Sequence, residues 1–239
     1  MALLTLVRHG QASYMADDYD RLSPLGELQA RKLGEFWVRH GLEFQQVFRG
    51  PARRHLQTCE IAGEVMRAAG KSWPEPGVIP EFDELDAGKV MHLCLPPLIE
   101  HNETIRRLND EFRAAEATPE AGRLLQALFE EVSLHWAEER VAVEQLESWR
   151  QFRARVRAAV EMVRRATPRS SSSVVFTSAG PIAATMSCLF DLPPQKSLDL
   201  IWTSRNASYS EFLFTGQRFS LSSYNSFPHL DDKSLLSYR

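Results

Sequence analysis

Short apolar runs alternate with amphipathic stretches over the first third of the chain. Residues 2–7 (ALLTLV) form an apolar run typical of a buried strand, and the run stops abruptly at Arg8. The segment 23–41 then has the spacing of an amphipathic helix, with Ser23 as N-cap, Pro24 at the first helical position and a glycine as its stop. A strand that ends in a loop before a helix is the first half of an α/β unit.

The same alternation continues and returns late in the chain. Residues 44–50 predict a second strand and residues 51–70 a second helix with one apolar face. Near the end, 173–178 predicts another buried strand, followed by a helix from Pro181 and by two strand-like runs, ASYSEFLF and RFSLSSYN. We therefore predict a three-layer α/β fold, in which helices cover both faces of a mostly parallel sheet.

The middle of the chain has few strand signals. Apolar residues recur at helical spacing there, so we predict a helical insertion over about 89–168 within a single domain of residues 1–239. We expect this insertion to form a lid over the site. Its arginine-rich stretch, Arg150 to Arg165, could attract phosphate, but we favour a solvated helix face paired with nearby glutamates.

Composition narrows the classes of function. The chain has 239 residues, 44% hydrophobic and 25% charged, which is enough to bury a sizeable core. Its formal net charge of −3 argues against a nucleic-acid partner. Three widely spaced cysteines suggest neither disulfides nor zinc, and no run is long enough for a signal peptide or a membrane span. We expect a cytoplasmic location.

The first candidate for chemistry stands at the end of the first predicted strand. A guanidinium such as that of Arg8 can hold two phosphate oxygens, and the neighbouring imidazole of His9 can attack phosphorus. Nearby cations would favour the neutral, nucleophilic form of that imidazole. RHG alone is a weak signal, because an exposed histidine at a strand end is commonly a surface residue.

Two further segments add possible partners. Arg53 and Arg54 open the second predicted helix, whose N-terminus favours anions, although an exposed arginine pair explains this segment equally well. DELDAG places Asp83, Glu84 and Asp86 in a loop. One of these carboxyls could act as a general acid beside a bound phosphate, whereas three solvated acids are the simpler explanation of the spacing alone.

Taken together, these motifs resemble the histidine phosphatase superfamily, the phosphoglycerate mutase-like and acid phosphatase-like proteins. The resemblance lies in LVRHGQAS, LSPLGELQARKLG, GPARRHLQTCEIA and EFDELDAG, followed by a late strand, turn and helix. Their order and spacing match over most of the chain outside 89–145. The resemblance implies a phosphomonoester hydrolase that acts on a small phosphorylated molecule and needs neither a metal nor a cofactor.

The resemblance also implies roles for individual residues. His9 would be the nucleophile that becomes a phosphohistidine, and Glu84 the proton donor. The phosphate would be bound by Arg8, Arg54, Ser178 and Gly10.

Two positions depart from the family's pattern. Ser178 holds the place where the family has a second pocket histidine, and a serine hydroxyl donates only one neutral hydrogen bond. Losing one preorganised donor costs on the order of 100 to 1000-fold in rate. Met15 replaces a polar residue that contacts phosphate in the mutases, which argues against mutase activity.

Three readings of function follow. The first is the hydrolase, and the second is a phosphate-binding or regulatory protein whose catalytic site has degenerated. The third is acyl transfer by Ser178 with His229 and Asp231, but Phe176 is too bulky for the first glycine position of a nucleophile elbow.

The remaining histidines could compensate for the missing imidazole. We expect that one of them partly replaces it, with His55 beside Arg54 and His92 in the covering segment as candidates, or else that Arg205 does so.

Overall fold

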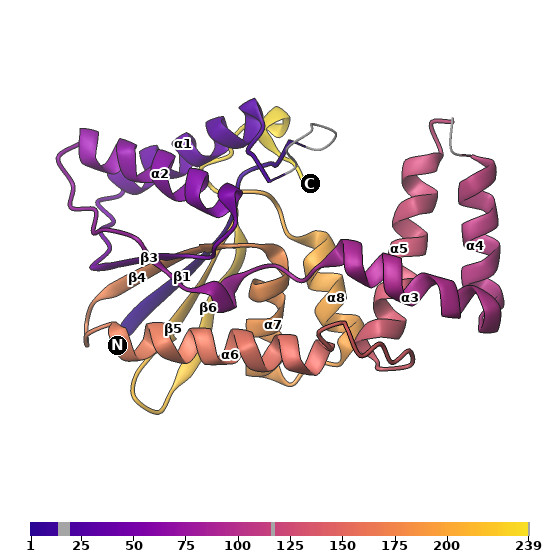
Figure 1. Ribbon diagram of the computed structural model, residues 1–239. Helices are drawn as coiled ribbons and strands as arrows, with labels where there is room; N and C mark the ends of the chain where they lie inside the picture. The colour runs from indigo at the N-terminus through magenta and orange to yellow at the C-terminus, as the bar shows by residue number, and fades with distance from the viewer. Residues whose placement is uncertain (14–19, 116–117, 239) are drawn as a thin grey trace.

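The computed structural model describes residues 1–13, 20–115 and 118–238, and its core is one mixed sheet (Figure 1). Within these ranges the strand order is β3-β2-β4-β1-β5-β6; β3, β2, β4 and β1 are parallel, whereas β5 and β6 are antiparallel to them. The strands are β1 (Ala2–Arg8), β2 (Gln46–Arg49), β3 (Gly77–Val78), β4 (Ser172–Thr177), β5 (Tyr209–Phe214) and β6 (Phe219–Ser226). The predicted α/β class is confirmed.

Helices cover both faces of this sheet. In Figure 1, α1 and α2 lie on one side of it, and α6 and α7 lie on the other. No helix in the described part of the chain is long and apolar enough to cross a membrane. The helices are α1 (Pro24–Arg39), α2 (Arg53–Ala68), α3 (Ala87–His101), α4 (Glu103–Ala114), α5 (Ala121–Ala137), α6 (Trp149–Ala166), α7 (Ala179–Phe190) and α8 (Pro194–Thr203), with short 3₁₀ turns at Pro80–Phe82 and Lys233–Leu235.

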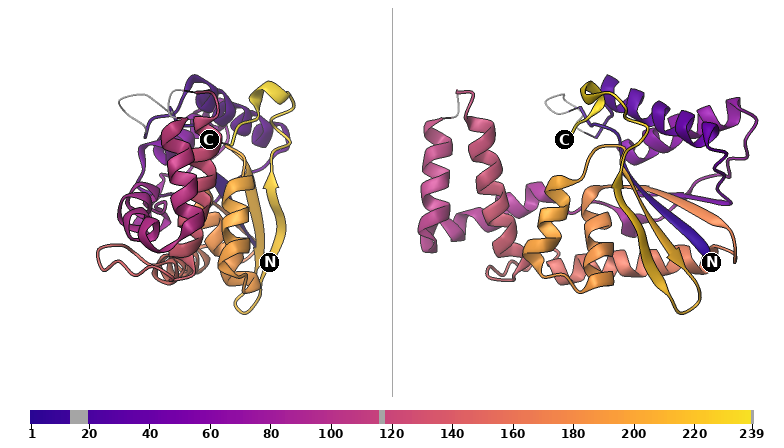
Figure 2. Two further views of the ribbon diagram at one scale, coloured as in Figure 1. Left: turned by 90° about the vertical axis from the view of Figure 1, so that its right-hand side faces the viewer. Right: turned by 180° about the vertical axis from the view of Figure 1, so that it is seen from behind.

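The segment predicted as an insertion, 89–168, divides into two parts. The helices α3, α4 and α5 pack on one another at one end of the sheet, with α4 and α5 as an upright pair (Figures 1 and 2). The fourth helix, α6, instead runs along the sheet face and buries Phe152 and Val156 in the main core. The part of the segment that stands outside the layers is therefore α3–α5.

The buried strands β1 and β4 supply two cores, one on each face. Leu4 and Leu6 of β1 point toward α6 and α7, while Val7 points toward α1 and α2. On that second face the ring of Trp37 meets Phe176 edge-on, with ring centroids 6.1 Å apart. Alternate side chains of a strand thus pack against helices on opposite faces of the sheet. Both sets are therefore apolar, and the strand appears in the sequence as a continuous apolar run.

Predicted element ends lie close to those of the structure, but α7 begins earlier than expected and α8 was not predicted. Ser23 accepts a hydrogen bond from the Gly26 N–H at 3.1 Å as the N-cap of α1. Gly41 has a φ of +67° after α1, which an L side chain rarely adopts. The helix that was expected to begin at Pro181 begins at Ala179, so Ser178 is its N-cap residue. The two-residue strand β3 was missed, because so short a strand has no detectable periodicity.

Two glycines let the loop after β1 lie directly on the first turn of α1. A Cβ on Gly10 would lie 2.4 Å from the Gly26 carbonyl oxygen, and a Cβ on Gly26 would lie 2.1 Å from the Gln11 carbonyl oxygen. Both obstacles are main-chain atoms, which have little freedom to move. This close main-chain contact positions the loop that begins with His9 against the first turn of α1.

We expect Gly26→Ala to lower the free energy of unfolding by about 1–3 kcal/mol, because the added methyl group meets the backbone of the loop. Gly122→Ala, on α5, is the matched control. Nothing lies within 4 Å of a Cβ there, so better helix propensity should raise the free energy of unfolding by up to about 1 kcal/mol. Urea denaturation of both variants measures the difference, and equal stability would show that the loop can retreat.

Candidate active site

Parallel pairing of β1 and β4 brings the two halves of the site together. Arg8 pairs with Thr177 at the carboxyl ends of the strands, and the His9 N–H donates to the Thr177 carbonyl at 2.9 Å. His9 and Ser178, the next residue of each strand, therefore emerge side by side. The crevice at the carboxyl ends of parallel strands is the usual place for a ligand in an α/β sheet.

His9 is buried and held in one tautomer. Its Nδ1 lies 2.7 Å from the Gly10 carbonyl oxygen, and because a carbonyl can only accept, Nδ1 carries the hydrogen. Burial, followed by the charges of Arg54 and Arg8, holds the pKa of His9 well below its ordinary value. The ring is neutral near pH 7 and its Nε2 has a free lone pair, as a nucleophile requires.

Arg8 is buried beside His9. Its guanidinium donates to the carbonyl oxygen of Ser204 and, at 2.8 Å, to that of Tyr238. These carbonyls belong to segments more than 190 residues away in sequence. The C-terminal segment thus fixes the orientation of Arg8 at the end of β1.

The start of α2 is an anion site that a carboxylate of the same chain contacts. Asp20 accepts from the Arg53 N–H at 2.7 Å and from the Arg54 guanidinium at 2.6 Å. Inside the same turn, Thr58 donates to the Arg54 carbonyl and accepts from the Gly10 N–H at 3.1 Å. The main-chain N–H of Gly10 therefore has a protein partner, and α2 is tied to the loop after β1.

The three acids of the predicted loop accept hydrogen bonds from different parts of the chain. Asp83 accepts from the Glu84 N–H at 2.9 Å, and Asp86 caps α3 by accepting from the Lys89 N–H at 2.9 Å. Glu84 instead reaches across to α7 and accepts from the Gly180 N–H at 3.1 Å. Asp83 and Asp86 thus bond within the loop and the start of α3, whereas Glu84 bonds across to α7.

Burial favours the protonated form of Glu84. It raises the pKa of that carboxyl above its ordinary value, although hydrogen bonds from the Gly180 and Leu85 N–H groups and the charges of the arginines oppose the shift. A Cβ on Gly180 would lie 1.9 Å from Glu84 Oε1, so the glycine makes room for the carboxyl. The motif around Ser178 thus matters as much for its glycine as for its serine.

His55 lies behind Ser178 and fills the space beside His9. Its Nε2 is 2.7 Å from Ser178 Oγ, both residues are fully buried, and the His9 and His55 ring centroids are 5.7 Å apart. Arg54 approaches the same hydroxyl at 3.4 Å. Of the three candidates for a compensating group, His55 is the one that the structure brings to Ser178.

The other two candidates lie elsewhere. His92 is exposed on α3, and Arg205 stacks on the rings of Phe227 and Tyr238, 4.0 and 5.3 Å from their centroids. Similarly, His229 packs near the rings of Phe36 and Tyr209. The imidazole that contacts Ser178 is therefore His55, which does not favour an acyl-transfer triad with His229.

One residue of the arginine-rich stretch supports the site, which sequence reasoning missed. Arg155 of α6 donates to the carbonyls of Glu81 and Asp83 at 2.8 and 3.1 Å, and it also pairs with Glu147. It thereby clamps the acid loop to the sheet layer. The helical spacing put Arg155 among solvated arginines, and only the fold shows that it faces the loop.

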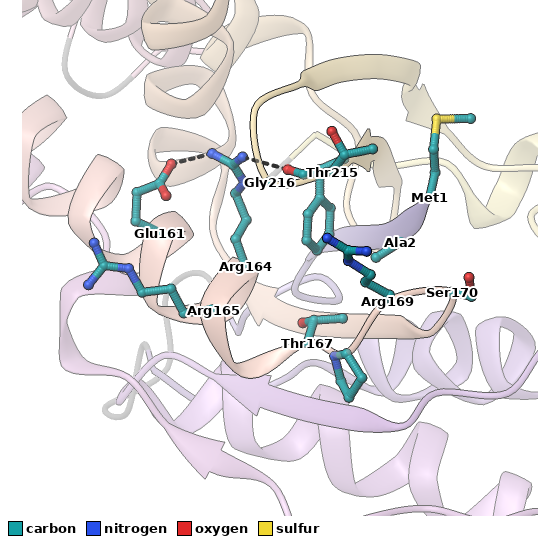
Figure 3. Close-up of a pocket in the computed structure, with 12 residues that line it drawn as sticks. Met1, Ala2, Glu161, Arg164, Arg165, Thr167, Arg169, Ser170, Thr215 and Gly216 are labelled. Carbon is teal, nitrogen blue, oxygen red and sulfur yellow. Dashed lines mark hydrogen bonds and ion pairs between the residues drawn. The ribbon is translucent and has the colours of Figure 1, made fainter.

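Two pockets lie at opposite ends of the strands. A pocket of about 380 Å³ opens beside the candidate site and is lined by Asp20, Pro51, Ala52, Arg54, Asp83, Glu84, Leu85 and Asp86. A pocket of about 770 Å³ lies at the opposite end of the strands, near Ala2 and Phe214 (Figure 3). There Arg164 pairs with Glu161 and donates to the Thr215 carbonyl, as expected for a helix face paired with glutamates.

Met15, which was expected to replace a phosphate-contacting residue of the mutases, lies outside the described residues. No group of three or more histidine, cysteine or acidic side chains in the described ranges could hold a metal ion. Cys59, Cys94 and Cys188 are free thiols.

Comparison with known proteins places these features in a family. A family model described as the histidine phosphatase superfamily (branch 1) matches residues 4–128 and 117–226. No curated protein matches the sequence closely enough to count as a relative.

Solved structures share the fold at low identity. YhfR of Bacillus stearothermophilus matches at a TM-score of 0.66 and 16% identity, over 97% of this chain and 100% of that one. A mycobacterial glucosyl-3-phosphoglycerate phosphatase complexed with VO₃ matches at 0.61 and 23%, over 94% and 98%. A phosphoserine phosphatase mutant of Entamoeba histolytica, complexed with phosphoserine, matches at 0.57 and 17%, over 96% and 100%. At such identities the likeness shows the fold alone.

The lowered pKa of His9 predicts a pH dependence of stability. Below pH about 6.5, His9 binds a proton in the unfolded chain but not in the folded protein, because its pKa is lowered there. The free energy of unfolding therefore falls as the pH drops toward the lowered pKa. In His9→Asn this slope should be shallower by up to about 1.4 kcal/mol per pH unit. Urea denaturation between pH 7.5 and 5 measures it, with the exposed His101→Asn as control. An unchanged slope would mean that folded His9 takes up its proton over the same pH range as in the unfolded chain.

Proposed function

Because the chain belongs to the histidine phosphatase superfamily, we propose that it hydrolyses phosphomonoesters through a phosphohistidine at His9. The observation that carries this proposal is the fixed tautomer of His9, whose Nδ1 hydrogen bond to Gly10 leaves Nε2 as a neutral nucleophile between arginines. The geometry supports His9 as the attacking group, since its unprotonated Nε2 belongs to a ring at the carboxyl end of β1, near the charges of Arg54 and Arg8.

The first step of the proposed reaction transfers the phosphoryl group to His9. Nε2 attacks phosphorus, the bond from phosphorus to the leaving oxygen breaks, and the proton on Glu84 passes to that oxygen. The raised pKa of Glu84 keeps this proton available, and its position on the wall of the 380 Å³ pocket suits a leaving group that occupies that pocket.

The second step releases phosphate. Water attacks phosphorus, its proton goes to the Glu84 carboxylate, and the phosphorus–nitrogen bond breaks to restore His9. Arg8 and Arg54 would balance the charge on the phosphoryl oxygens in both steps, which is the service that a metal ion provides elsewhere. In this proposal Gly10 acts by shaping the loop, because its N–H and its carbonyl are already bonded within the protein.

Substrate binding involves an exchange of anions at α2. Asp20 already contacts the Arg53 N–H and the Arg54 guanidinium, so a phosphate entering there takes the place of its carboxylate. A pocket of about 380 Å³ fits a small phosphorylated molecule. The described neighbours support this class, since their names include phosphoserine and glucosyl-3-phosphoglycerate. We assign selectivity among such molecules to α3–α5, which follow the acid loop directly.

A second function follows from the resemblance, which implies that Ser178 holds the place of the family's second pocket histidine. Ser178 supplies a single neutral donor there. With weaker stabilisation of the transferring phosphoryl group, the same pocket would serve as a phosphate sensor rather than as a catalyst.

The nucleophile is tested by His9→Ala. We expect hydrolysis of p-nitrophenyl phosphate and of a panel of phosphorylated metabolites to fall by at least about 10⁴-fold, because the covalent route is lost. His101→Ala, an exposed histidine of α3, is the control. Reactions with ³²P-labelled substrate, quenched in alkaline detergent, should trap a phosphoenzyme that acid hydrolyses and alkali does not, in the wild type and the control but not in His9→Ala. Equal activity of wild type and His9→Ala over a broad pH range would reject the hydrolase and leave the phosphate-binding function.

The general acid is tested by Glu84→Gln. We expect kcat to fall by about 10² to 10⁴-fold for an alkyl phosphate, whose leaving oxygen needs a proton. The loss should be much smaller for p-nitrophenyl phosphate, because p-nitrophenolate leaves without one. Glu64→Gln, on the exposed side of α2, serves as control. Equal losses for both substrates would show that Glu84 supports the loop and does not transfer the proton.

A further inference from the structure

Ser178 occupies a helix N-cap position without capping the helix. An N-cap serine ordinarily accepts a hydrogen bond from a main-chain N–H of the first turn. In α7 the Ser178 side chain makes no such bond. Its oxygen lies instead 2.7 Å from His55 Nε2 and 3.4 Å from an Arg54 nitrogen. The hydroxyl is thus turned away from its local role and toward the candidate site.

The surroundings of His55 decide which way the hydrogen bond to Ser178 runs. His55 Nδ1 is buried and has no hydrogen-bond partner in the described part of the structure. A buried N–H without a partner is rarer in proteins than a buried acceptor without one, so the hydrogen belongs on Nε2. Burial, Arg54 and Arg49 hold the pKa of His55 well below its ordinary value, so the ring carries one hydrogen and not two.

With that tautomer, the Ser178 oxygen receives two hydrogen bonds. One comes from His55 Nε2 and the other from Arg54, and a hydroxyl oxygen has two lone pairs. Both lone pairs are then occupied, so the hydroxyl hydrogen has to point away from His55 and Arg54. Because Arg8 pairs with Thr177, the residue beside Ser178 is His9, and we take the remaining direction of the hydroxyl hydrogen to be toward the His9 side.

We propose that His55 is a positioning residue that acts through Ser178: it donates to the serine oxygen, so that the serine hydroxyl donates to a phosphoryl oxygen during transfer. The inference rests on the proposed function of the site. It divides the task of one imidazole between two residues, with the donor between β4 and α7 and the supporting residue on α2.

The glycine at position 50 leaves room for the His55 ring. A Cβ on Gly50 would lie 2.5 Å from His55 Nδ1, so the residue that follows β2 has to be a glycine for the ring to take this place. The same ring blocks a larger side chain at position 178. A serine there and a histidine at 55 therefore fit each other, which is the expected result if the pair acts as one unit.

Steady-state kinetics of Ser178→Ala, His55→Leu and the double variant test the proposal. We expect each single change to lower kcat about 100 to 1000-fold with little change in KM, because the donor acts on the transferring group. The double variant should be no worse than the poorer single variant, since both changes remove one hydrogen bond. Losses that multiply in the double variant would overturn the proposal.

A conservative variant separates positioning from packing. The amide nitrogen of His55→Gln can donate at nearly the place of Nε2, so we expect this variant to recover most of the kcat lost in His55→Leu. Thermal unfolding of all variants, with the exposed His101→Leu as control, identifies any loss of fold. If His55→Gln is as slow as His55→Leu while both are folded, His55 has no donor role.

Orthovanadate binding distinguishes failure of this inference from failure of the proposed function. If the wild type hydrolyses no phosphomonoester, the proposed function fails, and vanadate affinity of the same variants then tests the pair alone. Equal weakening in both single variants and in the double variant supports the relay. Unchanged affinity in His55→Leu contradicts it. If the wild type is active but both single variants keep full kcat, the hydrolase stands and the relay is wrong.

Discussion

Parallel pairing of three strands is the constraint on which this site depends. Arg8 pairs with Thr177, and Arg49 pairs with Phe176, so β1, β4 and β2 end at one level of the sheet. The next residue or two of each strand then turn into the same crevice, where His9, Ser178 and the start of α2 meet. A slip of one residue in either pairing would turn these side chains to the opposite face.

Burial favours the neutral form of each of three ionisable groups in the site, His9, His55 and Glu84. The arginines beside the two imidazoles favour their neutral forms, and burial acts in the same direction. Burial also favours the protonated form of Glu84, although the arginines oppose it. The same surroundings therefore favour a neutral base and a protonated acid, which is what the proposed transfer of a phosphoryl group to nitrogen with protonation of the leaving oxygen would require.

The acid loop links this chemistry to the part of the chain that stands outside the sheet layers. Glu84 lies between a 3₁₀ turn and α3, so the helices α3–α5 extend directly from the loop that carries Glu84, the proposed proton donor. Arg155 clamps the other side of this loop to α6. A substrate that contacts α3–α5 would consequently act on the position of Glu84 as well as on its own binding.

The sequence by itself determined the alternating α/β architecture and the residues at strand ends. Apolar runs that stop at Arg8 and at Ser178 report burial directly, and the glycine, proline and serine signals at helix ends are local. These features depend on neighbours within a few residues, so they can be read from the chain. Family resemblance then brought Arg8, His9, Arg54 and Glu84 into one hypothesis.

Only the tertiary structure decided how these residues divide their tasks. The pattern DELDAG could not say which acid enters the site, since that depends on the Gly180 N–H, almost a hundred residues away. Likewise, His55 stood among several histidines with no distinguishing spacing, and its contact with Ser178 spans 123 residues. Hydrogen bonds and charge at such separations follow from strand order and register, and these are set by packing of the whole sheet.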